Sequence, residues 1–204
     1  LDQTKTRTLL ENLSAHESIP EPLHEKLIEL LKLYFFIGGM PEAIAEYIKS
    51  EKLSIVREVQ QEILSAYEKD FAKHAPTHEI MKITVVWQQV HRQLAKENKK
   101  FIFSAIRKSA RGRDYEEAIQ WLADAGLIHK SHLVESPKFP LSAYADSQIF
   151  KIFLLDVGLL GAQSHLSAPI ILEGDSLFTE FKGALTENYV AQERIASGQK
   201  VLYY

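Results

Sequence analysis

The stretch DYEEAIQWLADAGLIHK, residues 114–130, decides the fold class, because it changes from a helical to a strand pattern within a few residues. Its apolar positions first recur at spacings of three and four, which predicts a helix over residues 114–125. The buried stripe of that helix is Tyr115, Ala118, Ile119 and Leu122. Asp114 and Glu117 have the spacing of a capping box, and Gly126 suits the end of the helix. Residues 127–130 then predict a strand.

The residues on either side of this stretch extend the pattern to a winged helix-turn-helix. Downstream, a turn at Pro137–Pro140 and the apolar run Phe150–Leu155 predict the second strand of a hairpin. Upstream, a helix beginning at Glu79 carries an apolar stripe as far as Val90 and is followed by the turn Arg111–Arg113. Helix, turn, helix and hairpin occur in this order in winged helix-turn-helix domains.

Both ends of the chain are predicted to be mainly helical. Before residue 79 the pattern predicts helices over 23–37, closed by Gly38 and Gly39, over 41–48, and over 53–71, stopped by Pro76. After the hairpin it predicts a loop over 164–174, a helix over 177–196 and a terminal strand over 200–204. That strand has no partner after it, which favours truncation of a sheet. The expected fold class is therefore mainly α with a small β component.

The composition is that of an ordinary soluble protein. The chain has 204 residues, 46% of them hydrophobic, a formal net charge of −3 and no cysteine. The absence of cysteine excludes a disulfide framework and thiolate zinc sites, and it favours a reducing compartment, so we expect a cytoplasmic protein. No run approaches the roughly 20 apolar residues of a membrane span, and the first residues do not resemble a signal peptide.

The charges are distributed unevenly along the chain. Residues 92–113 contain eight basic and one acidic side chain, a net charge of +7, whereas both flanking segments are acidic. We call these eight residues the basic island: Arg92, Lys96, Lys99, Lys100, Arg107, Lys108, Arg111 and Arg113. The aromatic side chains of Phe101 and Phe103 are interleaved with them. In a winged helix such a cluster could contact nucleic-acid phosphates, and the alternatives are a solvated loop or a surface that docks on an acidic partner.

Catalytic motifs are scarce. There is no GxxxxGK[ST] and no GxGxxG, so the segment has no phosphate-binding loop, and no Gly-x-Ser-x-Gly supports a serine nucleophile. Asp70, His74 and His78 are spaced four apart, but Pro76 interrupts the helical register, which favours plain surface side chains over a metal site. Glu187 lies on a small, apolar helix face, where it is either a boundary residue or one acid of a metal-binding group.

Six separated strings, in order, resemble one known family. They are YFFIGGMPEA (34–43), YEKDFAKH (67–74), QLAKENKKFIFS (93–104), YEEAIQWLADAGLI (115–128), FLLDVGLLG (153–161) and LEGDSLFTEFKGALTENYV (172–190). The chain is similar to the C-terminal domain, of unknown function, of prokaryotic AAA-superfamily ATPases. The resemblance covers the chain from about Leu23 onward.

The resemblance implies a domain organisation and a candidate site. Residues 1–78 look like a helical lid-like region, 79–165 like a winged-helix domain, and 166–204 like the truncated start of a PD-(D/E)XK nuclease-like domain. Glu187 would match the first-helix glutamate of that nuclease-like fold and would be the catalytic residue. The family pattern continues with an aspartate and a Glu-x-Lys, and the sequence ends at Tyr204 before either of them. ATP and magnesium are implied for the parent protein, and no cofactor for this segment.

Three functions remain open on this basis. The first is a non-catalytic regulatory or partner-recognition module, which would contact the N-terminal ATPase domain of the same protein. The second is a DNA-binding module that uses the basic island, with Lys99, Lys100, Arg107, Lys108, Arg111 and Arg113 as contact residues. The third is part of a nuclease whose remaining catalytic residues lie beyond Tyr204.

Overall fold

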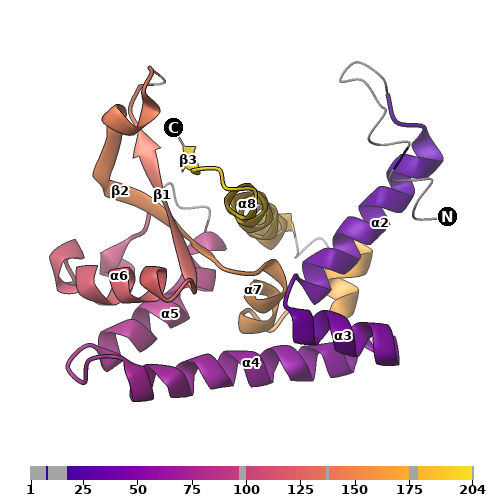
Figure 1. Ribbon diagram of the computed structural model, residues 1–204, viewed down its shortest axis with the longest axis horizontal. Coiled ribbons are helices and arrows are strands. Elements are labelled where there is room, and N and C mark those ends of the chain that lie inside the picture. Colours follow the sequence, from indigo (N-terminus) through magenta and orange to yellow (C-terminus); the bar gives the residue numbers. More distant parts are fainter. Residues whose placement is uncertain (1–7, 9–17, 97–99, 137, 175–178, 204) are drawn as a thin grey trace. The chain divides into compact units, whose positions relative to one another are not determined.

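The computed structural model is mainly helical, with one small three-stranded sheet (Figure 1). The structure describes every residue except 1–7, 9–17, 97–99, 137, 175–178 and 204. The chain divides into two compact units, residues 1–31 and 32–204. The first contains most of helix α2 (Glu21–Ile37), and the second contains all of the other elements described below.

The sequence pattern predicted the main helices of the second unit. These are α3 (Pro41–Ser50), α4 (Leu53–His74), α5 (Ile80–Leu94), α6 (Glu116–Asp124) and α8 (Thr179–Ala196). A further helix, α7 (Val157–Gln163), was not predicted, because its residues are apolar on every side and show no amphipathic stripe. Six of its seven residues are buried, as expected of a helix enclosed within a core. The predicted loop over 164–174 ends in a short π-helical turn, Ile170–Gly174.

The predicted capping box of α6 is wrong. Asp114 does not cap α6; it ends a 3₁₀ turn, Gly112–Asp114, that precedes the helix. Its carboxylate accepts a hydrogen bond from the backbone N–H of Arg111, at 3.1 Å. Helix α6 therefore begins two residues later, at Glu116. The stripe and the end of the helix are confirmed, since the four predicted side chains are buried and Gly126 has a φ of +71°.

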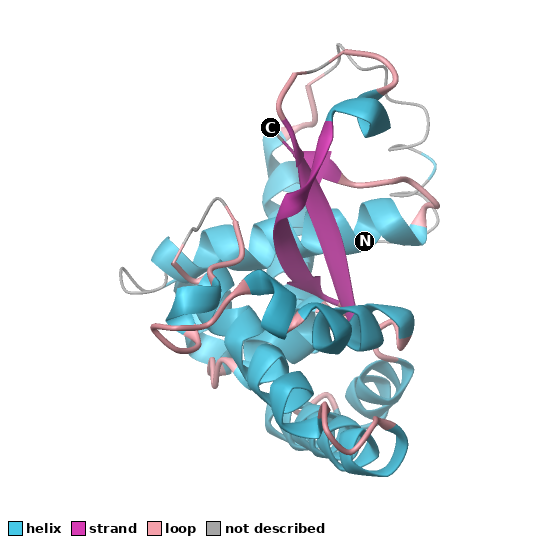
Figure 2. Ribbon diagram, turned by 90° about the vertical axis from the view of Figure 1, so that its left-hand side faces the viewer, coloured by secondary structure: helices cyan, strands magenta, loops and turns pink. Residues whose placement is uncertain are grey.

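The predicted hairpin is formed by β1 (Ile128–Val134) and β2 (Ala145–Leu154), which are antiparallel and bring Ile128 opposite Leu154. The expectation of an unpartnered terminal strand is wrong. Strand β3 (Leu202–Tyr203) pairs with β1 in parallel, so the strand order is β2-β1-β3 (Figure 2). Strand β3 therefore belongs to the same sheet as the hairpin.

The core of the second unit contains side chains from segments that the resemblance places in different domains. Trp87 of α5 is fully buried and makes an edge-to-face contact with Phe71 of α4, which in turn contacts Trp121 of α6 in the same way. Helix α8 packs against β2 and α7. The predicted borders near residues 78 and 165 both lie within this unit. Among the described residues, no helix has the length and apolar character needed to cross a membrane.

Candidate functional site

The basic island lies along the connection between α5 and α6. It begins at Arg92 in the last turn of α5 and ends at Arg113 in the 3₁₀ turn before α6. All of its members are exposed apart from Lys99, which lies outside the described residues. Within the described part of the chain, a single island side chain joins an ion pair, that of Arg113 with Asp114 at 3.9 Å. The island therefore presents an almost uncompensated positive charge to solvent.

The aromatic residues interleaved with the island pack against the hairpin, and Phe101 is buried in the core. Phe101 is 6% exposed, and its ring makes an edge-to-face contact with that of Phe103, with centroids 5.1 Å apart. Both rings also contact Phe150 of β2, and the backbone N–H of Phe101 donates to the carbonyl oxygen of Phe150 at 2.7 Å. These aromatic residues hold the connection against the hairpin, and the charged side chains on either side of them, such as Lys100 and Arg107, are exposed.

Helix α6 carries the opposite charge. Its exposed face consists of Glu116, Glu117, Gln120 and Asp124, as the sequence predicted. Gln120 donates a hydrogen bond to Asp124 and accepts one from Lys130 of β1. In a helix-turn-helix this helix would enter the major groove, but carboxylates on its exposed face are repelled by phosphates.

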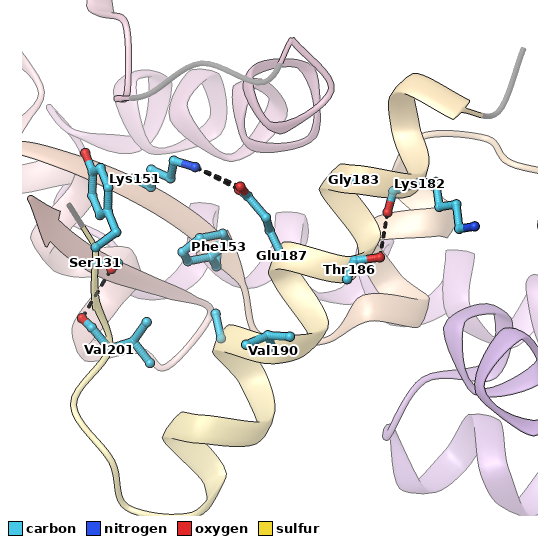
Figure 3. A pocket seen from close by; sticks show the side chains of 11 residues that line it. Ser131, Lys151, Phe153, Lys182, Gly183, Thr186, Glu187, Val190 and Val201 are labelled. Carbon is cyan, nitrogen blue, oxygen red and sulfur yellow. Dashed lines mark hydrogen bonds and ion pairs between the residues drawn. The ribbon is translucent and has the colours of Figure 1, made fainter. Parts of the chain in front are cut away.

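Glu187 lies at a groove between α8 and the sheet (Figure 3). The groove has a volume of about 580 Å³. Its floor is apolar, with Phe153 of β2, Val201 and Ala191 among its lining residues, and Val190 of α8 is 48% exposed beside it. The volume falls within the range of small-molecule sites, roughly 300–1,000 Å³.

The carboxylate of Glu187 is engaged by a lysine. The ammonium of Lys151 donates to both carboxylate oxygens at 2.9 Å, and the two side chains are 17% and 51% exposed respectively. The same ammonium lies 5.4 Å from the centre of the Tyr203 ring. Lys182 points away from Glu187 along α8 (Figure 3). Among the described residues, Glu187 belongs to no group of three or more side chains that could hold a metal ion.

The candidate metal residues of the sequence are not brought together. Asp70, His74 and His78 are all exposed, as expected of surface side chains. His78 lies instead beside Glu79 and Glu117, in a group that sequence spacing could not reveal because Glu117 comes from α6.

The sequence analysis also missed a buried polar junction at Asp156. This residue is 2% exposed and caps α7, with its carboxylate accepting from the backbone N–H of Leu159 at 2.9 Å. It also accepts from the backbone N–H of Gly39, at 2.6 Å, across 117 residues of sequence. Burial raises the pKa of Asp156, and backbone hydrogen bonds partly oppose this shift. Two short glycine-containing strings could have indicated the junction, IGGMP (37–41) and LLDVG (154–158).

Side chains of α4 and α8 extend the junction. Gln192 of α8 accepts from the backbone N–H of Val157 and donates to the hydroxyl of Tyr34. Burial, together with the nearby carboxylate of Asp156, raises the pKa of Tyr34 to about 12. From α4, Arg57 donates to the carbonyl oxygens of Gly158 and Leu166. The bonds to the N–H groups of Val157 and Leu159 satisfy the start of α7, and the others join side chains to neighbouring segments, so the junction is structural in character.

The comparisons with known proteins identify a family for this chain. The sequence profile of a family described as "Domain of unknown function (DUF8612)" matches residues 28–169, which is more than half of the chain. The chain belongs to the DUF8612 family. No curated protein and no solved structure matches the chain.

The DUF8612 match includes one candidate site, the basic island, and excludes the other, Glu187. The matched segment contains the basic island and the Asp156 junction with Gly38 and Gly39. It ends before α8, so Glu187 lies outside it. The basic island is therefore part of the DUF8612 domain, whereas eight of the eleven residues that line the groove follow the matched segment.

Proposed function

We propose that the chain is a non-catalytic recognition module of an AAA-type ATPase whose ATP-binding core lies outside this chain, and that its basic island binds a polyanionic partner, double-stranded DNA first of all. The observation that carries the proposal is the island itself. Its seven described side chains are exposed, and one of them, Arg113, has an acidic partner in the described residues. Such a surface attracts phosphates by releasing their condensed counterions.

The charge distribution determines which part of the domain would contact DNA. The exposed face of α6 carries three carboxylates, so insertion of this helix into the major groove is unfavourable. The turn containing Arg111 and Arg113 and the preceding residues Arg107 and Lys108 carry no such penalty. We expect them to contact the phosphate backbone, which implies binding with weak dependence on base sequence.

The state of Glu187 supports a non-catalytic role. Phosphodiester cleavage by a metal requires carboxylates that hold the ion, and the Glu187 carboxylate is occupied by Lys151 on both oxygens. Among the described residues, Glu187 belongs to no group of three potential metal ligands. The sequence also lacks a phosphate-binding loop, so ATP and magnesium belong to the proposed parent protein.

The test is a fluorescence-anisotropy titration of a labelled duplex of about 20 base pairs at about 50 mM salt. The wild-type chain should bind, and a variant with Arg107, Lys108, Arg111 and Arg113 replaced by alanine should lose most of its affinity. A matched control replaces Lys49, Lys52, Lys69 and Lys73, which are exposed elsewhere in the fold and change the net charge equally. The absence of binding by the wild type, or equal losses in both variants, would contradict the DNA-binding proposal. ATP turnover by the purified chain would contradict the non-catalytic one.

A second candidate function is a DNA-binding winged helix coupled to a PD-(D/E)XK-type nuclease whose other catalytic residues lie beyond Tyr204. The observation that favours it is the position of Glu187, half exposed at a groove that can be reached from solvent. Its test compares a longer chain, extending past Tyr204, with its Glu187→Ala variant in the presence of magnesium. Cleavage that depends on Glu187 would support the nuclease, and equal cleavage by both proteins would exclude Glu187 from catalysis.

A further inference from the structure

A group of potential metal ligands lies where the start of α5 meets the start of α6. It consists of His78, Glu79 and Glu117, each of which offers one ligand atom within 4.8 Å of those of the other two. Neither the family match nor the proposed function assigns a role to these residues. His78 and Glu79 precede α5, and Glu117 lies in the first turn of α6, so the group joins two elements.

The buried member of this group is incompletely satisfied. The Glu79 side chain is 4% exposed, and its Oε2 atom is buried without a hydrogen-bond partner in the described structure. Its Oε1 atom accepts from the ammonium of Lys82, at 2.5 Å. A buried carboxylate with a free oxygen is costly, and a cation that uses this oxygen would offset the cost.

The position already attracts a positive charge. Lys82 is the one ammonium paired with Glu79 in the described residues, and its side chain is 41% exposed. A lysine carries its charge on a flexible stem of four carbons, so the ammonium can move into solvent when another cation takes its place. In this view Lys82 compensates Glu79 whenever the metal is absent.

The distances fit a metal ion after small movements. Ligands about 2.1 Å from one ion lie at most about 4.2 Å apart. The Nε2 atom of His78 and the Oε2 atom of Glu117 are 3.9 Å apart, within that limit. No separation within the group exceeds 4.8 Å, so none must shorten by more than about 0.6 Å to reach the limit of about 4.2 Å. His78 and Glu117 are free to make this movement, because their side chains are 74% and 79% exposed.

We propose that His78, Glu79 and Glu117 form a binding site for a divalent transition-metal ion, with Zn²⁺ as the reference ion, and that the ion displaces Lys82 from Glu79. One imidazole nitrogen with two carboxylate oxygens suits zinc and disfavours the hard ions Mg²⁺ and Ca²⁺, which prefer oxygen alone. Three protein ligands leave a fourth position for water. The bound ion would hold the residues before α5 against the start of α6.

The experiment is isothermal titration of the untagged chain with Zn²⁺, and separately with Mg²⁺. We expect one Zn²⁺ per chain and no comparable binding of Mg²⁺. The variants His78→Ala and Glu117→Gln, both at exposed positions, should weaken Zn²⁺ binding by at least about tenfold. Glu116→Gln is the matched control, since Glu116 is the exposed neighbour of Glu117 and lies outside the group, and it should bind like the wild type.

A Lys82→Met variant tests the displacement directly. Removal of the competing ammonium should tighten Zn²⁺ binding, and weaker or unchanged binding would overturn the displacement. The site itself would be overturned if the wild type does not bind Zn²⁺ or if His78→Ala and Glu117→Gln bind as tightly as the wild type. Because none of these variants alters the basic island, failure here would leave the DNA-binding proposal unaffected.

Discussion

The carboxylate of Asp156 accepts a hydrogen bond of 2.6 Å from the backbone N–H of Gly39, across 117 residues of sequence. The two residues bring the end of α2 and the start of α7 together at one point, which is buried on the side of Asp156 and exposed at Gly39. A Cβ on Gly38 would overlap Oδ1 of Asp156, and Gly38 also has a φ of +75°, which favours glycine. The close approach of the two segments therefore requires both the glycine at position 38 and the aspartate at position 156.

Replacing Gly38 with alanine should destabilise the protein by at least about 2 kcal/mol, because strain at positive φ adds to the overlap with Asp156. The matched control is Gly126→Ala, where φ is +71° and nothing lies within 4 Å of the added Cβ. The Gly126→Ala variant should lose roughly 1 kcal/mol of unfolding free energy, from backbone strain alone. Urea denaturation measures both losses, and equal losses would show that the contact with Asp156 contributes nothing.

An Asp156→Asn variant tests the ionisation of the buried carboxyl. Because burial raises the pKa of Asp156, the folded protein binds this proton more tightly than the unfolded chain does. The contribution of Asp156 to the unfolding free energy is thus greatest below its ordinary pKa of 3.8 and declines as pH rises through the higher folded value. Asn cannot titrate, so the stability difference between wild type and variant should narrow from acid to neutral pH. A difference that widens would contradict this account.

A double-mutant cycle on Lys151 and Glu187 should show a coupling of about 0.5–1 kcal/mol, since the pair is bidentate but half exposed at the carboxylate. The variants are Lys151→Met, Glu187→Gln and their combination, compared by urea denaturation at low and high salt. The coupling should decrease with salt. If the coupling free energy is zero at low salt, Lys151 does not occupy Glu187, and the Glu187 carboxylate is free for catalysis.

His91 should make the protein sensitive to mild acid. Burial, with a smaller contribution from Arg92, lowers the pKa of His91 below its ordinary value of 6.5. Its contribution to stability is therefore complete above pH 6.5 and is lost as pH falls through the lower folded value. A His91→Gln variant should lose less stability than the wild type over this range. Thermal denaturation at a series of pH values gives the comparison, and parallel curves for the two proteins would contradict it.

The sequence predicted the elements that have a periodic apolar pattern. The stripe of α6 identifies a buried face directly, and the apolar runs on either side of the Pro137–Pro140 turn identify the hairpin, so the helix and the pairing of the two strands were confirmed. Helix α7 has no polar face to contrast with its apolar one, and its pattern is therefore uninformative. The pairing of β3 with β1 depends on a contact between residues 70 positions apart, such as His132 with Leu202, which local pattern cannot reveal.

In the candidate sites too, local features could be predicted from the sequence and long-range contacts could not. The exposed charges of the basic island are a property of local composition, and the structure confirms that its described members face solvent. The partner of Glu187 could not be predicted, because Lys151 comes from β2 and meets α8 only after folding. The same holds for Glu117 beside His78 and for Asp156 beside Gly39, which long-range packing brings together.

The salt dependence of DNA binding measures how many phosphates the basic island contacts. With about four phosphate contacts, the affinity for a duplex should fall roughly 50-fold between about 50 and 150 mM salt, a slope of about −3.6 in log K against log salt. The variant lacking Arg107, Lys108, Arg111 and Arg113 should show a slope near zero wherever binding remains measurable. An affinity that is independent of salt, or a slope that this variant leaves unchanged, would show that the basic island does not contact the phosphates.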